Sequence, residues 1–111
     1  MRSHVLRDSL IDATTRLCTW PFEKWEALGA DPWNEEVGSP DDFERGGYVA
    51  VEALVVDRFM DETTEVLHIT VAASDFEREL GTDFFIYADG RLSWDRVVWE
   101  NVGGVPRLLD S

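Results

Sequence analysis

Apolar and polar residues alternate most clearly between residues 48 and 99, and this alternation predicts four β-strands. The first two strands are expected over Tyr48–Phe59 and Val66–Ser74, with an acidic turn between them. Two aromatic and β-branched runs then flank Asp89-Gly90, which is a strong signal for a hairpin. Because the links between these runs are short, the pattern predicts an antiparallel meander.

The turn at Asp89-Gly90 also predicts which side chains share a face of the sheet. A two-residue loop of type I′ would pair Tyr87 with Leu92 and Phe85 with Trp94. Since side chains alternate across a strand, these four would lie together, and we expect them to form the core face. The opposite face of the hairpin would carry Phe84, Ile86, Val97 and Trp99. That second face is covered either by another part of the chain or by a partner.

Two helices are predicted before the first strand. An apolar residue recurs every three or four positions from Val5 to about Cys18, which is typical of an amphipathic helix. A shorter helix is expected over Phe22–Leu28, where Pro21 can occupy the first position and Gly29 can end it. These elements account for residues 1–29.

The remaining segments are predicted to be irregular. Residues 30–47 are rich in proline, glycine and acids and indicate a long acidic loop, and residues 101–111 indicate an extended tail. The whole chain of residues 1–111 is therefore expected to be a single α+β domain. Its two N-terminal helices would pack on one face of a four-stranded antiparallel meander sheet, which occupies residues 48–100.

The charge balance restricts the class of partner. The chain carries 23 Asp and Glu residues against 10 Lys and Arg residues, giving a net charge of −13 at pH 7. Direct binding to nucleic-acid phosphates needs clustered Lys and Arg side chains, so the composition argues against it. An acidic surface instead favours a basic protein partner and speeds the encounter with it. Solubility alone would also explain such a charge.

The chain shows no membrane or export signal. No apolar run approaches the roughly 18 residues that a membrane helix needs, and no apolar stretch of a signal peptide follows the first residues. We therefore expect a cytoplasmic protein that does not bind membranes. The single Cys18 cannot form an internal disulfide and is interpreted as a small buried hydrophobic residue of the predicted helix, not as a nucleophile.

Few residues offer catalytic chemistry. The two histidines are His4 and His68, and no Cys/His cluster has the spacing of a zinc site. No metal or cofactor is therefore predicted, and an enzymatic role is disfavoured. One catalytic alternative stays open, in which His68 works as a base with Glu52 of the neighbouring strand.

The acids between Asp31 and Glu44 surround Trp33, and we expect them to lie beside the aromatic hairpin. This character resembles the immunity proteins that bacteria pair with polymorphic toxins. The resemblance implies blockade, in which acids occupy a positively charged cleft while Trp33 or Trp99 is an apolar anchor. The predicted partner-binding residues are Trp33, Glu35, Glu36, Asp41, Asp42, Glu44, Arg91, Asp95 and Trp99.

The order of two helices and then a meander is also similar to cystatin-like folds, including the nuclear-transport-factor-2-like family. That resemblance implies an alternative function as a small enzyme or ligand-binding domain. An apolar pocket between the helices and the sheet would then hold His68 and an acid. Nucleic-acid mimicry, with carboxylates in place of phosphates, and a purely structural subunit are two further interpretations.

Overall fold

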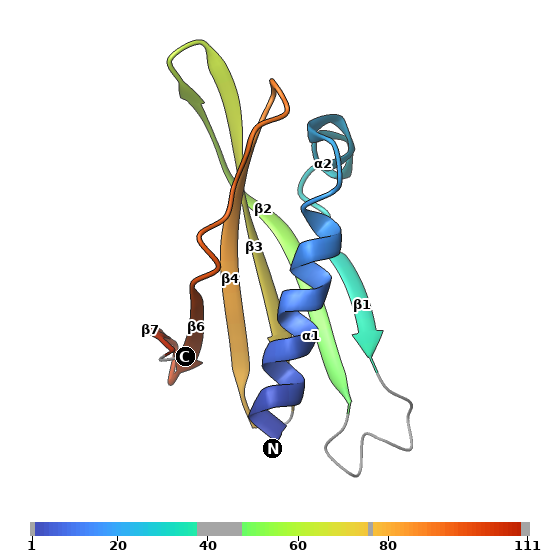
Figure 1. Cartoon of the computed structure of the whole chain (residues 1–111), viewed down its shortest axis with the longest axis vertical. Helices are drawn as coiled ribbons and strands as arrows, with labels where there is room; N and C mark the ends of the chain where they lie inside the picture. Colours follow the sequence, from blue (N-terminus) through green and yellow to red (C-terminus); the bar gives the residue numbers. More distant parts are fainter. Residues whose placement is uncertain (1, 38–47, 76, 110–111) are drawn as a thin grey trace.

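The computed structural model describes residues 2–37, 48–75 and 77–109, which form two helices and seven strands (Figure 1). The helices are α1 (Arg2–Leu17) and α2 (Phe22–Leu28). The strands are β1 (Trp33–Val37), β2 (Val49–Asp61), β3 (Thr64–Ser74), β4 (Glu79–Tyr87), β5 (Leu92–Ser93), β6 (Val98–Val102) and β7 (Val105–Leu108).

A single antiparallel sheet contains all the described strands, in the order β1-β2-β3-β4-β6-β7, with the short β5 paired to β4. Figure 1 shows α1 lying along one face of this sheet. The predicted α+β class with an antiparallel sheet is confirmed. The predicted number of four strands is wrong, because the sheet has seven.

The additional strands lie where irregular structure was expected. Strand β1 falls inside the predicted acidic loop, and β7 falls inside the predicted tail. Both are edge strands that pair on one side only, so their sequences need no clear apolar alternation. The Gly103-Gly104 pair, with φ values of 60° and 87°, makes the turn between β6 and β7. A two-glycine turn of this kind is a hairpin signal, and it identifies the predicted tail as part of the sheet.

The helices follow the predicted periodicity. The buried face of α1 consists of Leu6, Leu10, Ala13 and Leu17. Thr14 is buried beside them, and its hydroxyl donates to the Leu10 carbonyl at 2.7 Å, so this hydroxyl is not left unpaired. Helix α2 has the bounds predicted for it, and it ends at Gly29, whose φ of 65° is available to glycine at little cost.

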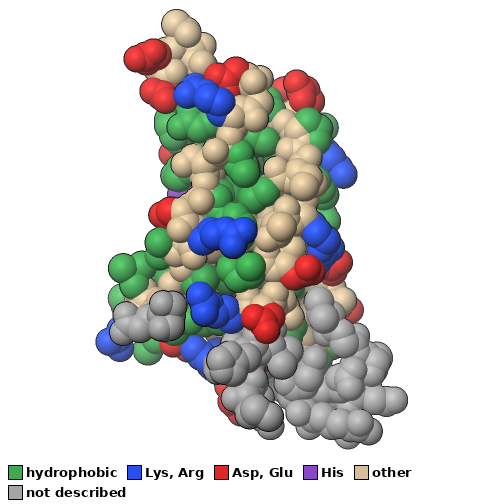
Figure 2. Space-filling model, viewed as in Figure 1, with side chains coloured by type: hydrophobic (Ala, Val, Ile, Leu, Met, Phe, Trp, Pro, Cys, Tyr) green, Lys and Arg blue, Asp and Glu red, His purple; other side chains and the backbone are tan. Residues whose placement is uncertain are grey.

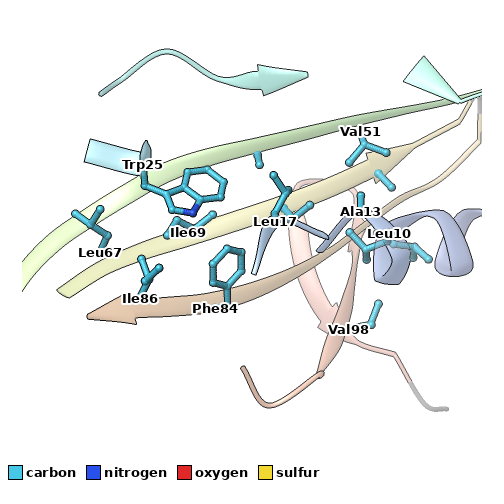
Figure 3. Close-up of a cluster of buried hydrophobic side chains, with 14 of the residues drawn as sticks. Leu10, Ala13, Leu17, Trp25, Val51, Leu67, Ile69, Phe84, Ile86 and Val98 are labelled. Atoms are coloured by element: carbon cyan, nitrogen blue, oxygen red, sulfur yellow. The ribbon is translucent and has the colours of Figure 1, made fainter. Parts of the chain in front are cut away.

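The core lies between the helices and one face of the sheet (Figure 3). Trp25 of α2 is fully buried and meets Phe84 of β4 edge to face, with 5.9 Å between the ring centroids. Leu17 of α1 and Ile69 of β3 contribute to the same cluster. Burial of each such side chain stabilises the fold by about 1.5–3 kcal/mol, so apolar contact is what holds the helices to the sheet.

The hairpin between β4 and β5 differs from the prediction by one residue. Its loop has three residues rather than two: the Tyr87 N–H donates to the Arg91 carbonyl, and the Gly90 N–H donates back to the Tyr87 carbonyl. Gly90 has a φ of 96°, but Asp89 lacks the positive φ that a type I′ turn requires. Leu92 is consequently paired with Ile86 instead of Tyr87.

The face of β4 that packs in the core is the opposite of the one predicted. Phe84 and Ile86 are buried under the helices, whereas Phe85 and Tyr87 are half-buried on the other side. The predicted core face of Phe85 and Tyr87 is therefore wrong. The prediction grouped Phe85 and Tyr87 with Leu92 through the assumed turn, and in the observed register Leu92 pairs with Ile86, so that reason for choosing the face disappears.

Candidate functional site

The sheet face that points away from α1 and α2 is the candidate site, and we call it the open face. None of the described helices covers it, and its side chains alternate in sequence with those of the core. Strands β1, β2 and β3 contribute Glu36, Glu52, Leu54, Asp57, Phe59, Val66, His68 and Thr70. Strands β4, β6 and β7 contribute Glu79, Gly81, Asp83, Phe85, Tyr87, Trp99, Asn101 and Leu108.

Asp83 is the centre of a hydrogen-bond network on this face. Its Oδ1 accepts a bond of 2.5 Å from the Thr70 hydroxyl and lies 3.0 Å from Nε2 of His68. Its Oδ2 accepts a bond of 2.9 Å from Nε1 of Trp99. The network therefore joins β3, β4 and β6 through one carboxylate. Such connected polar contacts hold side chains in a defined arrangement.

Aromatic rings surround this network. The His68 ring is stacked on Phe85 with 4.7 Å between centroids, and Phe59 meets Phe85 edge to face at 6.1 Å. The Trp99 ring lies directly over Gly81 of the paired strand, where a methyl group would overlap it. Glycine is therefore required at this position for Trp99 to lie flat on the sheet.

Two hollows flank the Trp99 ring. The smaller has a volume of about 190 Å³ and is lined by Asp83, Phe85, Ser93, Asp95, Val97, Trp99 and Leu108. The larger has a volume of about 510 Å³ and is lined by Glu79, Asp83, Trp99, Asn101, Gly104, Pro106 and Leu108. Both contain carboxylates and aromatic or aliphatic surface, and neither lining includes a Lys or Arg.

Most described basic side chains lie on the opposite side of the sheet. Figure 2, which looks onto the side that bears α1, shows Lys and Arg side chains spread across that side. Arg16 of α1 is bound to Glu35 at 2.5 Å, and this guanidinium lowers the pKa of Glu35. Arg58 is bound to Glu26 of α2 and to Glu65. These acids are neutralised locally, whereas the acids of the open face form no ion pair with a Lys or Arg among the described residues.

Arg91 is the basic residue at one end of the open face. Its guanidinium lies 4.3 Å from the centroid of the Tyr87 ring, and its Nε donates to Asp89 at 2.8 Å. The backbone N–H of Arg91 also donates to Asp89, and these contacts lower the pKa of the Asp89 carboxyl. The guanidinium of Arg91 is therefore already bound by residues of its own hairpin.

The structure separates the predicted partner-binding residues into two groups. Trp33 and Glu35 of β1 face the helices, where Trp33 packs against the core and Glu35 binds Arg16. Asp95 and Trp99 line the smaller hollow of the open face. Four strand spacings, about 19 Å, separate β1 from β6, so Trp33 and Trp99 are not adjacent.

The other five predicted partner-binding residues fall differently. Glu36 is exposed on β1 and accepts a hydrogen bond from the Tyr48 hydroxyl, which raises the pKa of Tyr48. Arg91 lies at the hairpin turn, as described above. Asp41, Asp42 and Glu44 lie outside the described residues.

The sequence interpretation missed Asp83 and misplaced Phe85. Asp83 lies in a strand between Thr82 and Phe84, both fully buried, and an acid between two core positions must point to the opposite face. That signal was present in the sequence but was hidden by the wrong turn type. The open alternative placed His68 beside Glu52 of the neighbouring strand, and the acid that His68 contacts in the structure is Asp83.

The acids, rings and hollows of the open face form an arrangement that is suited to binding. The pocket expected for a cystatin-like enzyme would hold His68 with an acid, but His68 lies on the open face, away from the helices. A hollow of about 270 Å³ does lie between α2 and the sheet, where Trp25, Val55 and Leu67 contribute to its lining, and His68 is not among its lining residues. Among the same residues, no group of three or more His, Cys, Asp or Glu is arranged to hold a metal ion. Burial raises the pKa of Cys18 to about 11, which keeps this thiol protonated near neutral pH.

No family model, curated protein or solved structure matches the chain. In the part of the chain that the structure describes, neither helix is long and apolar enough to cross a membrane.

Proposed function

We propose that this chain is a protein-interaction module that binds a basic protein partner through its open face. One observation carries the proposal: acids and aromatic rings gather on a sheet face that no described helix covers, while most described Lys and Arg side chains lie on the other side, beside the helices. The acids of this face are Glu36, Glu52, Asp57, Glu79 and Asp83, with Asp95 at the smaller hollow.

The chemistry of the open face matches what protein interfaces use. Aromatic side chains are enriched among the residues that carry binding energy, and Trp99, Phe85 and Tyr87 lie on one surface. Carboxylates around them attract a positively charged partner and exclude negatively charged ones. The hydrogen bonds of Asp83 hold the surface in one arrangement, so little ordering of side chains is needed on binding.

The resemblance to immunity proteins supplies a specific form of this function. The chain would block a basic toxin or enzyme by placing its acidic face against a positively charged cleft that normally receives an anionic substrate. Electrostatic steering would make association fast at low salt and slower as the salt concentration rises.

The test begins with affinity capture from the source organism to identify a basic partner, followed by kinetics with the purified pair. The double variant Glu52→Lys plus Asp57→Lys reverses charge on the open face. Glu23→Lys plus Asp31→Lys makes the same change in net charge on exposed residues of α2 and the link that follows it. We expect the association rate constant to fall at least about tenfold for the first variant and less than about twofold for the second.

The salt dependence gives an independent measure. The association rate constant of the native chain should decrease as salt rises, and this slope should flatten in the open-face variant. Equal effects of the two double variants on the rate constant and on its salt dependence would contradict the proposal, because only the net charge would then matter.

A further inference from the structure

We propose that the smaller hollow beside Trp99 binds the guanidinium group of an arginine side chain. This inference rests on the proposed function, since the arginine would belong to the basic partner. The guanidinium would lie in the hollow between the two carboxylates Asp83 and Asp95 and the aromatic rings of Phe85 and Trp99.

The two carboxylates retain capacity to accept hydrogen bonds. Oδ1 of Asp83 is used by Thr70 and His68, whereas Oδ2 accepts, among the described residues, only the Trp99 indole N–H, and a carboxylate oxygen can accept two bonds. Oδ1 of Asp95 accepts the backbone N–H of Val97 at 2.9 Å, and its Oδ2 makes no hydrogen bond to another described residue. The hollow therefore offers an unused acceptor on each carboxylate.

The walls favour a guanidinium over an ammonium. A guanidinium is flat, stacks on aromatic rings and donates several hydrogen bonds in one plane, whereas an ammonium is a compact and strongly hydrated charge. Phe85 and Trp99 provide the ring surface, and Asp83 and Asp95 provide the acceptors. Carboxylates and rings that line the same hollow allow an arginine to use both kinds of contact at once.

The Trp99 wall is held in place before a ligand arrives. Its indole N–H is bound to Asp83, and its ring rests on Gly81, where there is no side chain to displace it. Binding to a preformed wall avoids the cost of ordering a mobile side chain. His68 and Thr70 fix Asp83 in turn, so both partners of the Trp99–Asp83 bond are positioned by the sheet.

Size and charge agree with a single side chain as the occupant. The volume of about 190 Å³ is below the roughly 300–1,000 Å³ of pockets for drug-sized ligands. No Lys or Arg is among the lining residues, so an incoming cation would meet no like charge in the hollow. Arg91, the base at the end of the open face, is held by Asp89 and Tyr87.

The experiment titrates the purified full chain with N-acetyl-arginine amide and follows the indole N–H signals by two-dimensional NMR. The signal of Trp99, assigned with Trp99→Phe, should shift and saturate with a dissociation constant on the order of 1 mM. N-acetyl-citrulline amide has a neutral group of similar shape and should produce no saturable shift. N-acetyl-lysine amide should bind at least about fivefold more weakly.

Variants separate the hollow from the general charge of the face. Asp95→Asn keeps the size of an exposed side chain and should weaken binding of the arginine probe at least about fivefold. Glu52→Gln removes the same charge from the open face outside the hollow and should leave binding within about twofold. An unchanged affinity of Asp95→Asn, equal binding of the citrulline probe or equal binding of the lysine probe would each overturn the assignment.

This test and the test of the proposed function can fail separately. If the arginine probe does not bind but association with a basic partner still depends on Glu52 and Asp57, the hollow is not a guanidinium site and the proposed function stands. If the probe binds at the hollow but no basic partner depends on those acids, the guanidinium site stands without the proposed interaction.

Discussion

The two faces of the sheet differ in how their side chains are stabilised. The covered face meets α1 and α2 with apolar side chains, and Phe84 is fully buried against Trp25. The open face uses hydrogen bonds and ring contacts within the sheet, and Asp83 with Phe85 is its centre. Adjacent residues of one strand thus belong to different environments. The covered face supplies stability through burial, while the open face presents charge and aromatic surface to solvent.

The largest expected effect contrasts the neighbours Phe84 and Phe85 of β4. Phe84→Ala leaves a cavity in the core and should lower the free energy of unfolding by about 3–5 kcal/mol. Phe85→Ala removes half-buried ring contacts with His68 and Phe59 and should lower it by about 1 kcal/mol. Chemical denaturation of both variants measures the difference. Equal losses would show that the two faces are not distinct in burial.

A smaller effect is expected from Gly81→Ala. The added methyl group collides with the Trp99 ring, so this variant should lose about 1–3 kcal/mol of stability and shift the Trp99 indole signal. In a Trp99→Ala background the same change should cost much less, because the ring that causes the collision is gone. An equal loss of unfolding free energy in both backgrounds would mean that Gly81 is needed for another reason. Denaturation of the four proteins in this cycle provides the measurement.

The smallest effect concerns the ion pair between Glu35 and Arg16, on the covered side. Arg16 lowers the pKa of Glu35 below its ordinary value of 4.5. A carboxylate with a lowered pKa stabilises the fold above that ordinary value, and the contribution is lost as pH falls through the lowered pKa. Glu35→Gln should therefore cost about 0.2–1 kcal/mol at pH 7, because both side chains are partly exposed.

The difference between the native chain and Glu35→Gln should disappear in acid, when Glu35 is protonated in both states. Glu23→Gln provides the control, since Glu23 is an exposed acid of α2 that makes no ion pair with another described residue. It should change stability little at either pH. Thermal unfolding at pH 7 and in acid tests this contrast, and a cost that persists in acid would assign the effect of Glu35 to packing instead of charge.

Long periodic segments could be predicted from the sequence because their pattern is repeated many times. The leucine spacing of α1, the bounds of α2 and the alternation of β2 and β3 all follow from which positions meet the core. The edge strands β1 and β7 could not be predicted in this way. They pair on one side only, and what places them in the sheet is the neighbouring strand.

The candidate site could be predicted only in part for the same reason. Trp99 and Asp95 were singled out from residue type alone, and they line one hollow. Asp83 was missed, because its three hydrogen-bond donors lie 13 to 16 positions away along the chain. The association of Trp33 with Trp99 assumed that a long loop folds over the hairpin, and β1 instead joins the opposite edge of the sheet.

The sequence by itself determined that this protein has an acidic α+β chain with two amphipathic helices and a largely antiparallel sheet. These properties depend on local composition and on periodicity, which each segment carries independently. Tertiary structure decided the register of the β4–β5 hairpin, and it decided which face of β4 is buried. The physical reason is that alternation with a period of two gives β4 one face with Phe84 and one with Phe85, both rich in large apolar residues, and only the packing of the helices against the sheet selects the face with Phe84 for the core.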